Sequence, residues 1–388
     1  SGTAAVGFAA TGQVSVDGFE PIEFANKTNL VINGLAGDDV INLNNPTTPA
    51  GLTGSITVNG GDPAGSDELV VTGVPLSFDN FGITPTAQGA GNIVNFGTPQ
   101  PALNYTRIED IALASQYTDG DLFLVDGTVG NDLFQVFSGV SPGTGTVRGL
   151  MDANNATGVG PFSLPEITFE GDVTSNAGIF NFSGAGGADV FEFHGTDTDD
   201  EIFLDSWAVT GAVIVHNVNA TPFNQYGVTN IGTILVEGRD GDDEVTLGAD
   251  PSGFGGPGPL VPNLTVNGGN PASGSDVLNF NGTGAGLITI ETDLETVTET
   301  GSGAVSYSGI EHLNADAGGA AVDVNGSLDD DAFTFQPLDA DSALVTQQGV
   351  NTVFRIDNTA DLEIDGDNGA GLENSAVVLG TEGDDVID

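Results

Sequence analysis

The sequence predicts an all-β protein, and within that class a parallel β-helix or β-solenoid. Composition is the first reason: 59 glycines, 22 phenylalanines, one methionine and no cysteine accompany many Val, Ile, Thr and Asn residues, which favours short strands joined by tight turns. Patterning is the second reason, because short apolar runs alternate with glycine-rich corners and no stretch shows sustained helical periodicity. The third reason is an internal repeat.

Several of the expected strands alternate strictly between apolar and polar residues. Phe180–Phe182 (F-N-F) and Phe191–Phe193 (F-E-F) are examples, so one face of each is expected to be buried and the other wet. Strand, glycine corner, strand and a longer return loop is the pattern of β-helix coils, whose aligned apolar side chains stack into interior ladders. Tandem antiparallel β-sandwich domains are the alternative fold. The expected strands of the first repeat are 30–32, 40–43, 55–58, 69–72, 108–113, 122–125, 133–137, 167–169, 179–182, 190–193 and 201–204.

The chain contains a tandem duplication. Gly34 and Asp38 recur 204 residues later as Gly238 and Asp242. We therefore expect two solenoid repeats of ~200 residues each, residues 1–205 and 206–388. Three further matches follow in the same order: 57–63 with 265–271, 105–111 with 307–313, and 127–134 with 326–333.

The last residues of the chain match a stretch of the first repeat. Gly380–Ile387 (G-T-E-G-D-D-V-I) aligns with Gly195–Ile202 (G-T-D-T-D-D-E-I), so a third copy is expected to fit after Asp388. It could belong to the same polypeptide or to the next subunit. Because a solenoid edge must be capped or continued, we expect the chain to assemble with itself, head to tail, through its N- and C-terminal coils.

The charge balance restricts the partners. The chain has 55 acidic and 5 basic residues, a formal net charge of -50. Nucleic acid and anionic membrane surfaces are excluded as partners, because binding them needs clustered Lys and Arg. No apolar run is long enough to cross a membrane, so no membrane insertion is expected. So much negative charge needs counterions, either bound Ca²⁺ or a medium rich in K⁺ or Na⁺.

The stretch Val31–Leu43 (V-I-N-G-L-A-G-D-D-V-I-N-L) shows the recurring unit: an apolar run, a glycine corner, paired aspartates and a second apolar run. Related stretches occupy 122–137, 179–193 and 235–247. Neighbouring coils of a solenoid lie about 4.8 Å apart. Carboxylates at equal corner positions would repel by about 3 kcal/mol per pair at an effective dielectric constant of about 20. Ca²⁺ would offset this repulsion, since it accepts carboxylate and carbonyl oxygens in flexible geometry.

The candidate calcium ligands are therefore the corner aspartates. The alternative is that Asp and Gly are plain turn formers here, with Asp accepting a backbone hydrogen bond and Gly supplying positive φ. This alternative weighs most for single aspartates such as Asp67 and Asp276. Zinc is disfavoured because cysteine is absent and the three histidines are scattered. The predicted ligands are Asp38, Asp39, Asp132, Asp189, Asp199, Asp200, Asp242, Asp243, Asp330, Asp331, Asp384 and Asp385.

These corners resemble the hemolysin-type (RTX) calcium-binding repeats of exported bacterial proteins, whose nonapeptide has the form G-G-x-G-x-D-x-U-x. Gly184–Phe191 (G-A-G-G-A-D-V-F) and Gly37–Ile41 (G-D-D-V-I) match it best. The family runs its nonapeptides back to back, whereas roughly 20 to 40 residues separate single corners in this chain. The resemblance implies local calcium corners and an exported protein.

Together these observations predict an extracellular, cell-surface structural protein: a calcium-stabilised repeat unit of a surface layer, filament or adhesin stalk. A polysaccharide lyase or hydrolase is the main alternative, because parallel β-helices host such enzymes and Arg148 and Arg355 occupy loosely equivalent places in the two halves. Paired carboxylates among so many acidic residues give this alternative little specificity. A carbohydrate- or ice-binding surface is a third possibility, prompted by the alternating threonines of Thr296–Thr300. We expect no catalytic residues.

Overall fold

The computed structural model confirms the all-β class. Within the described residues every regular element is a β-strand, and most strand pairs are parallel. Parallel pairing is what the solenoid prediction requires and what tandem antiparallel sandwiches lack. The structure describes residues 12–44, 52, 54–62, 67–72, 80–95, 101–114, 122–139, 144–170, 179–207, 212–217, 224–248, 263–270, 275–366 and 374–380.

The chain divides into two compact units. Unit 1 comprises Ser1–Phe191 and Ala220–Ile231, and unit 2 comprises Glu192–Asn219 and Gly232–Asp388. Each unit contains two ladders of paired strands. Alternation of apolar and polar residues explains the strands, since most show alternating burial with the apolar side chains inside.

The first ladder of unit 1 is parallel except for one antiparallel meander in its middle. Its strands in pairing order are β3 (Leu30–Ala36), β5 (Ser55–Asp62), β9 (Ala102–Thr106), β8 (Ala90–Asn95), β7 (Asn80–Ala87), β11 (Leu122–Asp126), β16 (Ile179–Ser183) and β20 (Asn224–Thr229). Only the β9–β8 and β8–β7 pairs are antiparallel among these.

The second ladder of unit 1 has the same design with a later meander. Its strands are β4 (Val40–Asn44), β6 (Glu68–Thr72), β10 (Asp110–Ala114), β15 (Glu166–Glu170), β13 (Thr144–Met151) and β12 (Leu133–Ser138), with the short β14 (Phe162–Ser163) beside β13. β17 (Val190–His194) follows β12, because the Val190 N–H donates to the Asp132 carbonyl. β1 (Gly12–Val14) and β2 (Ile22–Phe24) form a separate antiparallel hairpin.

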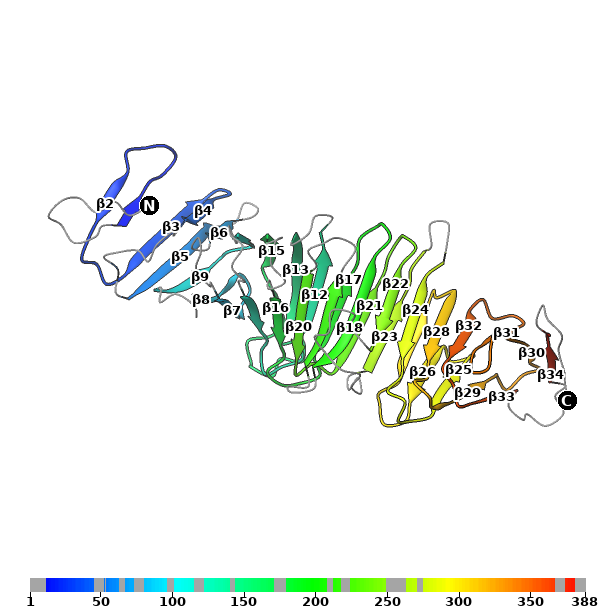
Figure 1. Ribbon diagram of the computed structural model, residues 1–388. Coiled ribbons are helices and arrows are strands. Elements are labelled where there is room, and N and C mark those ends of the chain that lie inside the picture. The colour runs from blue at the N-terminus through cyan, green and yellow to red at the C-terminus, as the bar shows by residue number, and fades with distance from the viewer. Residues whose placement is uncertain are drawn as a thin grey trace. The chain divides into compact units, whose positions relative to one another are not determined.

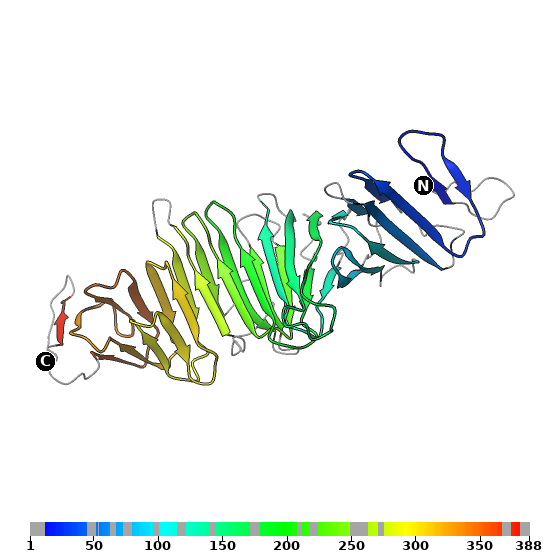
Figure 2. The same cartoon turned by 180° about the vertical axis from the view of Figure 1, so that it is seen from behind.

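Unit 2 repeats this pairing order. Its first ladder runs β21 (Thr233–Glu237), β23 (Asn263–Asn267), β27 (Val305–Ser308), β26 (Thr296–Glu299), β25 (Ile288–Glu291), β29 (Ala321–Asn325) and β33 (Asp361–Asp365). Its second runs β18 (Glu201–Trp207), β22 (Glu244–Leu247), β24 (Val277–Asn281), β28 (His312–Asp316), β32 (Val353–Asp357), β31 (Ala343–Gln347), β30 (Ala332–Pro337) and β34 (Ser375–Val378), with β19 (Ala212–Asn217) antiparallel to β18. Figure 1 shows β24, β28 and β32 side by side, and Figure 2 shows the same yellow-to-orange strands from behind.

In-register pairing stacks like residues inside each unit. Phe81, Phe123 and Phe180 share one register position on β7, β11 and β16, and their ring centroids lie 6.0 and 5.4 Å apart. Each is almost completely buried. Burying a side chain of this size stabilises a fold by about 1.5–3 kcal/mol. The predicted interior ladders are therefore present in the described strands.

The antiparallel meanders are elements that the sequence analysis misses. It expects no strand at β7, β8, β9 or β13. β7 contains Gly82 and Pro85, which lower strand propensity and hide the alternation, and the pairing shifts between Pro85 and Ala87. Hydrogen bonding to neighbouring strands completes these strands where local sequence does not.

Candidate functional site

The corner aspartates follow a common spacing. At six corners in the described part of the chain a glycine precedes the aspartate by five residues, and the aspartate ends the turn just before a strand. Five of these aspartates are buried and Asp39 is half-buried. Burial of so many carboxylates requires specific partners. The six pairs are Gly34 and Asp39, Gly127 and Asp132, Gly184 and Asp189, Gly195 and Asp200, Gly238 and Asp243, and Gly326 and Asp331.

Several of the corner carboxylates accept a backbone hydrogen bond from a neighbouring corner. In unit 2 the Asp200 N–H donates to Asp243 Oδ1 at 2.8 Å, and the Asp243 N–H donates to Asp276 Oδ1 at 2.9 Å. The Asp276 N–H then donates to Glu311 Oε2 at 2.8 Å. We call Asp200, Asp243, Asp276 and Glu311 the unit 2 acid column. It ties consecutive parallel strands together at the corner.

Unit 1 has an equivalent column. The Asp39 N–H donates to Asp67 Oδ1 and the Asp67 N–H to Glu109 Oε2, both at 2.9 Å. We call these three residues the unit 1 acid column. Asp132 and Asp189 are linked in the same way, from the Asp132 N–H to Asp189 Oδ1 at 2.8 Å. The acid columns thus recur in both halves of the duplication.

The glycine of each pair makes room for the carboxylate. A Cβ on Gly238 would lie 2.4 Å from Asp243 Oδ2 and 2.3 Å from the Gly268 carbonyl oxygen. On Gly184 it would lie 2.2 Å from Asp189 Oδ2. Carbon and oxygen do not approach this closely without a bond, so any larger residue would displace the aspartate or the neighbouring backbone. The requirement for glycine is therefore steric at these positions.

The second carboxylate oxygen divides the corners into two kinds. In one kind Oδ2 accepts the N–H of the residue after the glycine: Thr128 donates to Asp132 at 2.6 Å, and Ser327 to Asp331 at 3.0 Å. Asp200 receives the same bond from Thr196. In the other kind Oδ2 is buried without a hydrogen-bond partner, and these atoms belong to Asp39, Asp189, Asp243 and Asp276.

At two of the corners whose aspartate Oδ2 has no hydrogen-bond partner, the backbone conformation is also unusual. Leu35 and Arg239, which follow the corner glycines of Asp39 and Asp243, have φ angles of 85° and 89°. These are left-handed values that residues with a Cβ seldom adopt. Neither residue donates to the aspartate, so the buried Oδ2 stays without a donor. These corners combine backbone strain with an unsatisfied acceptor.

Burial changes the acidity of these carboxyl groups. Desolvation raises the pKa of Asp243 to about 7; the hydrogen bond from the Asp200 N–H opposes this rise, and the charges of Asp200 and Asp276 add to it. Desolvation likewise raises the pKa of Asp189 to about 6. The pKa of Asp276 is also raised, mainly by burial. Removing an ionised oxygen from water is costly unless a donor or a cation replaces the water.

One corner uses an amide instead of a carboxylate. Asn374 Oδ1 accepts the Asp331 N–H at 2.9 Å, and its Nδ2 donates to the Gly366 carbonyl oxygen at 2.7 Å. A Cβ on Gly366 would lie 2.6 Å from Asn374 Nδ2, so the glycine plays the same steric role. The amide satisfies both of its polar atoms without charge. The corner therefore needs a side-chain oxygen that accepts the neighbouring N–H, and it does not need a negative charge.

The structure brings some predicted calcium ligands together and separates others. Asp200 contacts Asp243, Asp132 contacts Asp189, and the Asp242 N–H donates to Asp199 Oδ1 at 3.0 Å. The first aspartates of the pairs lie outward: Asp38, Asp199 and Asp330 are exposed and Asp242 is half-buried. Asp384 and Asp385 lie outside the described residues. Across the described ranges, no group of three or more His, Cys, Asp or Glu side chains is placed to hold a metal ion. Calcium binding stays a prediction.

Several residues of the columns were not among the predicted ligands. Asp67, Asp276, Glu109 and Glu311 are column members, and Asn374 plays the same role. Their signal was present in the duplication, because Glu109 matches Glu311 within an aligned stretch, and Asp67 and Asp276 follow shortly after the aligned stretches 57–63 and 265–271. The spacing hid Asp67 and Asp276, since the glycines that their carboxylates face, Gly60 and Gly268, lie seven and eight residues before them instead of five.

Arginines pair with exposed acids near the corners. Arg239 contacts Asp197 and Arg107 contacts Asp62, each at 3.0 Å. All four side chains are largely solvent-exposed, so each pair adds little stability.

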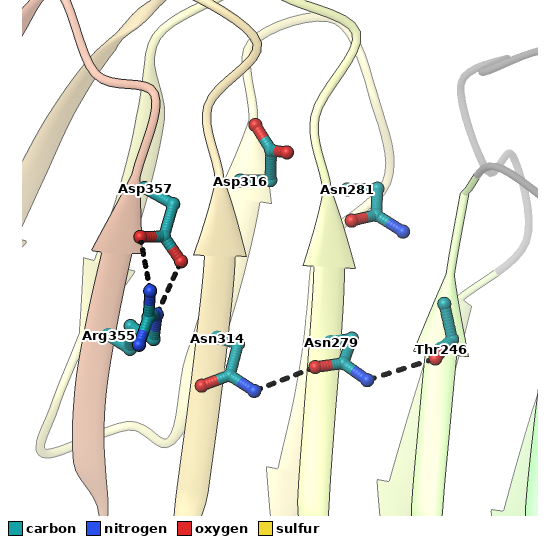
Figure 3. A pocket seen from close by; sticks show the side chains of 7 residues that line it. All are labelled: Thr246, Asn279, Asn281, Asn314, Asp316, Arg355 and Asp357. Atoms are coloured by element: carbon teal, nitrogen blue, oxygen red, sulfur yellow. Dashed lines mark hydrogen bonds and ion pairs between the residues drawn. The ribbon is translucent and has the colours of Figure 1, made fainter. Parts of the chain in front are cut away.

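A polar hollow of about 310 Å³ lies on the outward face of unit 2 (Figure 3). An amide chain crosses it: Asn314 Nδ2 donates to Asn279 Oδ1 at 2.8 Å, and Asn279 Nδ2 donates to Thr246 Oγ1 at 3.0 Å. Arg355 lies on its wall in a two-bond ion pair with Asp357. Such side chains could contact a polar ligand. The hollow is lined by Thr246, Asn279, Asn281, Asn314, Asp316, Arg355 and Asp357.

Comparison of the chain with protein-family models and with curated protein sequences gave no match. Among the described residues there is no helix long and apolar enough to cross a membrane.

Proposed function

We propose that this chain is an extracellular structural protein, a repeat unit of a surface layer, filament or adhesin stalk. The observation that carries the proposal is the repetition of one stacking device: parallel ladders in register, closed at the corners by acid columns that recur in both units. We interpret the paired ladders as the coils of a β-solenoid. Such a stack transmits force along its length and can be extended by adding repeats.

Calcium is part of the proposal. In the described residues, four buried aspartate Oδ2 atoms have no donor, and the exposed Asp38 and Asp240 flank two of these corners. A net charge of -50 adds a general need for cations. Ca²⁺ bound at the outer aspartates would lower the repulsion along the columns, and its ligands would come from carboxylates and from carbonyls at the glycine corners. The resemblance to RTX repeats points the same way.

Negative-stain electron microscopy with and without Ca²⁺ tests the structural function. We expect fibres or sheets in millimolar Ca²⁺ and their dispersal when a chelator removes it. Particles that stay monomeric under both conditions would contradict the proposal.

A polysaccharide-acting enzyme is the second candidate, and the polar hollow is the observation that favours it. Arg355 and the carboxylates of Asp316 and Asp357 line its wall together. A lyase needs a cation beside the substrate carboxylate, and the Arg355 guanidinium could supply it. The test is an assay for cleavage of an acidic polysaccharide, with Arg355→Ala as the variant. Cleavage that the variant abolishes would support this candidate against the structural one.

A further inference from the structure

The hairpin strand β2 corresponds to strand β20 in the duplication. Residues 22–37 align with 226–241 at the same offset of 204 that relates Gly34 to Gly238. Backbone conformation supports the alignment independently of sequence. Asn26 and Asn230 have φ angles of 56° and 55°, and Gly37 and Gly241 have φ angles of 133° and 146°. Ile22 and Phe24 therefore hold the places of Tyr226 and Val228.

Strand β33 corresponds to strand β16. β16 pairs in parallel with β11, where Phe180 lies beside Phe123, and β33 pairs in parallel with β29, where Leu362 lies beside Val322. Phe123 and Val322 are 199 residues apart, the offset that relates Gly127 to Gly326. Leu362 and Ile364 therefore hold the places of Phe180 and Phe182.

Within unit 1, β16 and β20 are partners. They pair in parallel, with Phe180 beside Tyr226 and Phe182 beside Val228, and all four side chains are buried. The apolar side chains of the corresponding strands β2 and β33 are less buried. Ile22 is 66% exposed, and Leu362 and Ile364 are only half-buried. In the described part of the chain, β33 pairs with β29 alone and β2 with β1 alone.

We propose that β2 of one copy of this chain adds in parallel to the free edge of β33 of a second copy, in the register of the β16–β20 pair. Ile22 then lies beside Leu362, and Phe24 beside Ile364. The inference rests on the proposed structural function and names its head-to-tail contact. A second copy is the occupant because the chain already contains this pairing once. In that pair, β20 matches β2 in sequence offset and backbone conformation, and β16 matches β33 in its parallel partner strand.

The register also places Glu23 beside Glu363, with both side chains outward. Like charges on adjacent strands disfavour pairing. Added salt or Ca²⁺ screens them, so the contact should strengthen as the cation concentration rises.

Disulfide trapping tests the register, because the chain has no cysteine of its own. Glu23→Cys and Glu363→Cys are made in separate chains, mixed in Ca²⁺ and oxidised. Adjacent parallel strands lie about 4.8 Å apart, within the Cα separation that a disulfide spans. Glu23→Cys mixed with Asp365→Cys is the control, because two residues along the strand increase the separation to about 8 Å. We expect the 23–363 disulfide, identified by peptide mass spectrometry, to exceed the control product by about tenfold or more.

A second variant separates the contact from folding. Ile22→Lys in the Glu23→Cys chain should cut the disulfide yield about tenfold, because the exposed Ile22 loses its apolar partner only in the assembly. Leu294→Lys, 65% exposed in unit 2, is the matched control and should change nothing. Fibres that form without the 23–363 disulfide and survive Ile22→Lys would overturn this contact while leaving the structural function standing. A chain that stays monomeric with and without Ca²⁺ would overturn both.

Discussion

At the scale of single residues, a glycine and an aspartate together make each corner. The glycine leaves a space that the carboxylate fills, and at Asp189 and Asp243 the carboxylate also accepts the N–H of an aspartate from a neighbouring corner. The pattern is more specific than turn propensity, because it pairs two positions five residues apart. It also explains why the aspartates alternate between outward and buried.

Gly184→Ala tests this steric role. Its Cβ would meet Asp189 Oδ2 at 2.2 Å and the Asn230 carbonyl oxygen at 2.5 Å, so we expect the unfolding free energy to fall by about 1–3 kcal/mol. Gly186→Ala is the matched control in the same turn, since its nearest neighbour would be 3.6 Å away. Urea unfolding of both variants measures the difference. Equal stabilities would contradict the steric account.

Asp243→Asn tests whether the corner needs charge. The Asn374 corner shows that an amide can accept the neighbouring N–H and donate to a carbonyl. Without calcium at pH 8, we therefore expect Asp243→Asn to be at least as stable as the parent. Asp243→Ala, which leaves the buried Asp200 N–H without its acceptor, should lose about 1–3 kcal/mol. Chemical denaturation in EDTA compares the three proteins. A loss for the asparagine variant as large as for alanine would show that the charge itself is required.

At the scale of elements, stacked strands carry buried carboxyl groups in columns, and this makes stability depend on pH. The pKa of Asp243 is raised to about 7 and that of Asp189 to about 6, both above the ordinary value of an aspartate. The folded chain thus binds more protons than the unfolded chain between about pH 4 and pH 7. Stability from these groups is fully present below about pH 4 and is lost as the pH rises through their raised pKa values.

We therefore expect the calcium-free chain to unfold at a lower urea concentration at pH 8 than at pH 5. A tenfold change in acid dissociation corresponds to about 1.4 kcal/mol, so a shift of this direction should be measurable in the urea midpoint. Asp243→Asn should remove Asp243's share of this pH dependence. Stability that rises between pH 5 and pH 8 in EDTA would contradict the raised pKa values.

Sequence alone predicted the strands whose alternation is strong, such as β11, β16 and β17. The alternation of their apolar residues identifies the buried face of each strand from local sequence alone. It failed for the meander strands β7, β8 and β13, where Gly, Pro and Asn interrupt the alternation and pairing with adjacent strands decides the structure.

For the site, the sequence singled out the corner aspartates but predicted neither their burial nor what the carboxylates contact. Asp243 was expected to face a cation, and in the structure its Oδ1 accepts the Asp200 N–H. Hydrogen bonds between corners depend on which strands stack, and the long, variable loops between corners hide that order from the sequence. Glu109 and Glu311 were missed for a second reason as well, because neither has a glycine five residues before it.

At the scale of the whole molecule, the duplication relates unit to unit strand by strand. The first ladders of both units place one antiparallel meander after three parallel strands. A chain built from such interchangeable layers suits a structural role, because each layer needs only its neighbours for stability. The remaining question at this scale is how a charge of -50 is accommodated.

Thermal unfolding in Ca²⁺ and in EDTA answers that question most directly. At pH 8 and fixed ionic strength, we expect millimolar Ca²⁺ to raise the melting temperature steeply over EDTA, because the proposed calcium ions would offset repulsion among ionised corner aspartates and bind only the folded arrangement. The rise should shrink at pH 5, where protons compete for the same oxygens. Equal ionic strength in KCl is the control that separates calcium from general screening. Two results would contradict a calcium-stabilised stack: melting curves that coincide in Ca²⁺ and EDTA, or a melting temperature that KCl alone raises as much as Ca²⁺ does.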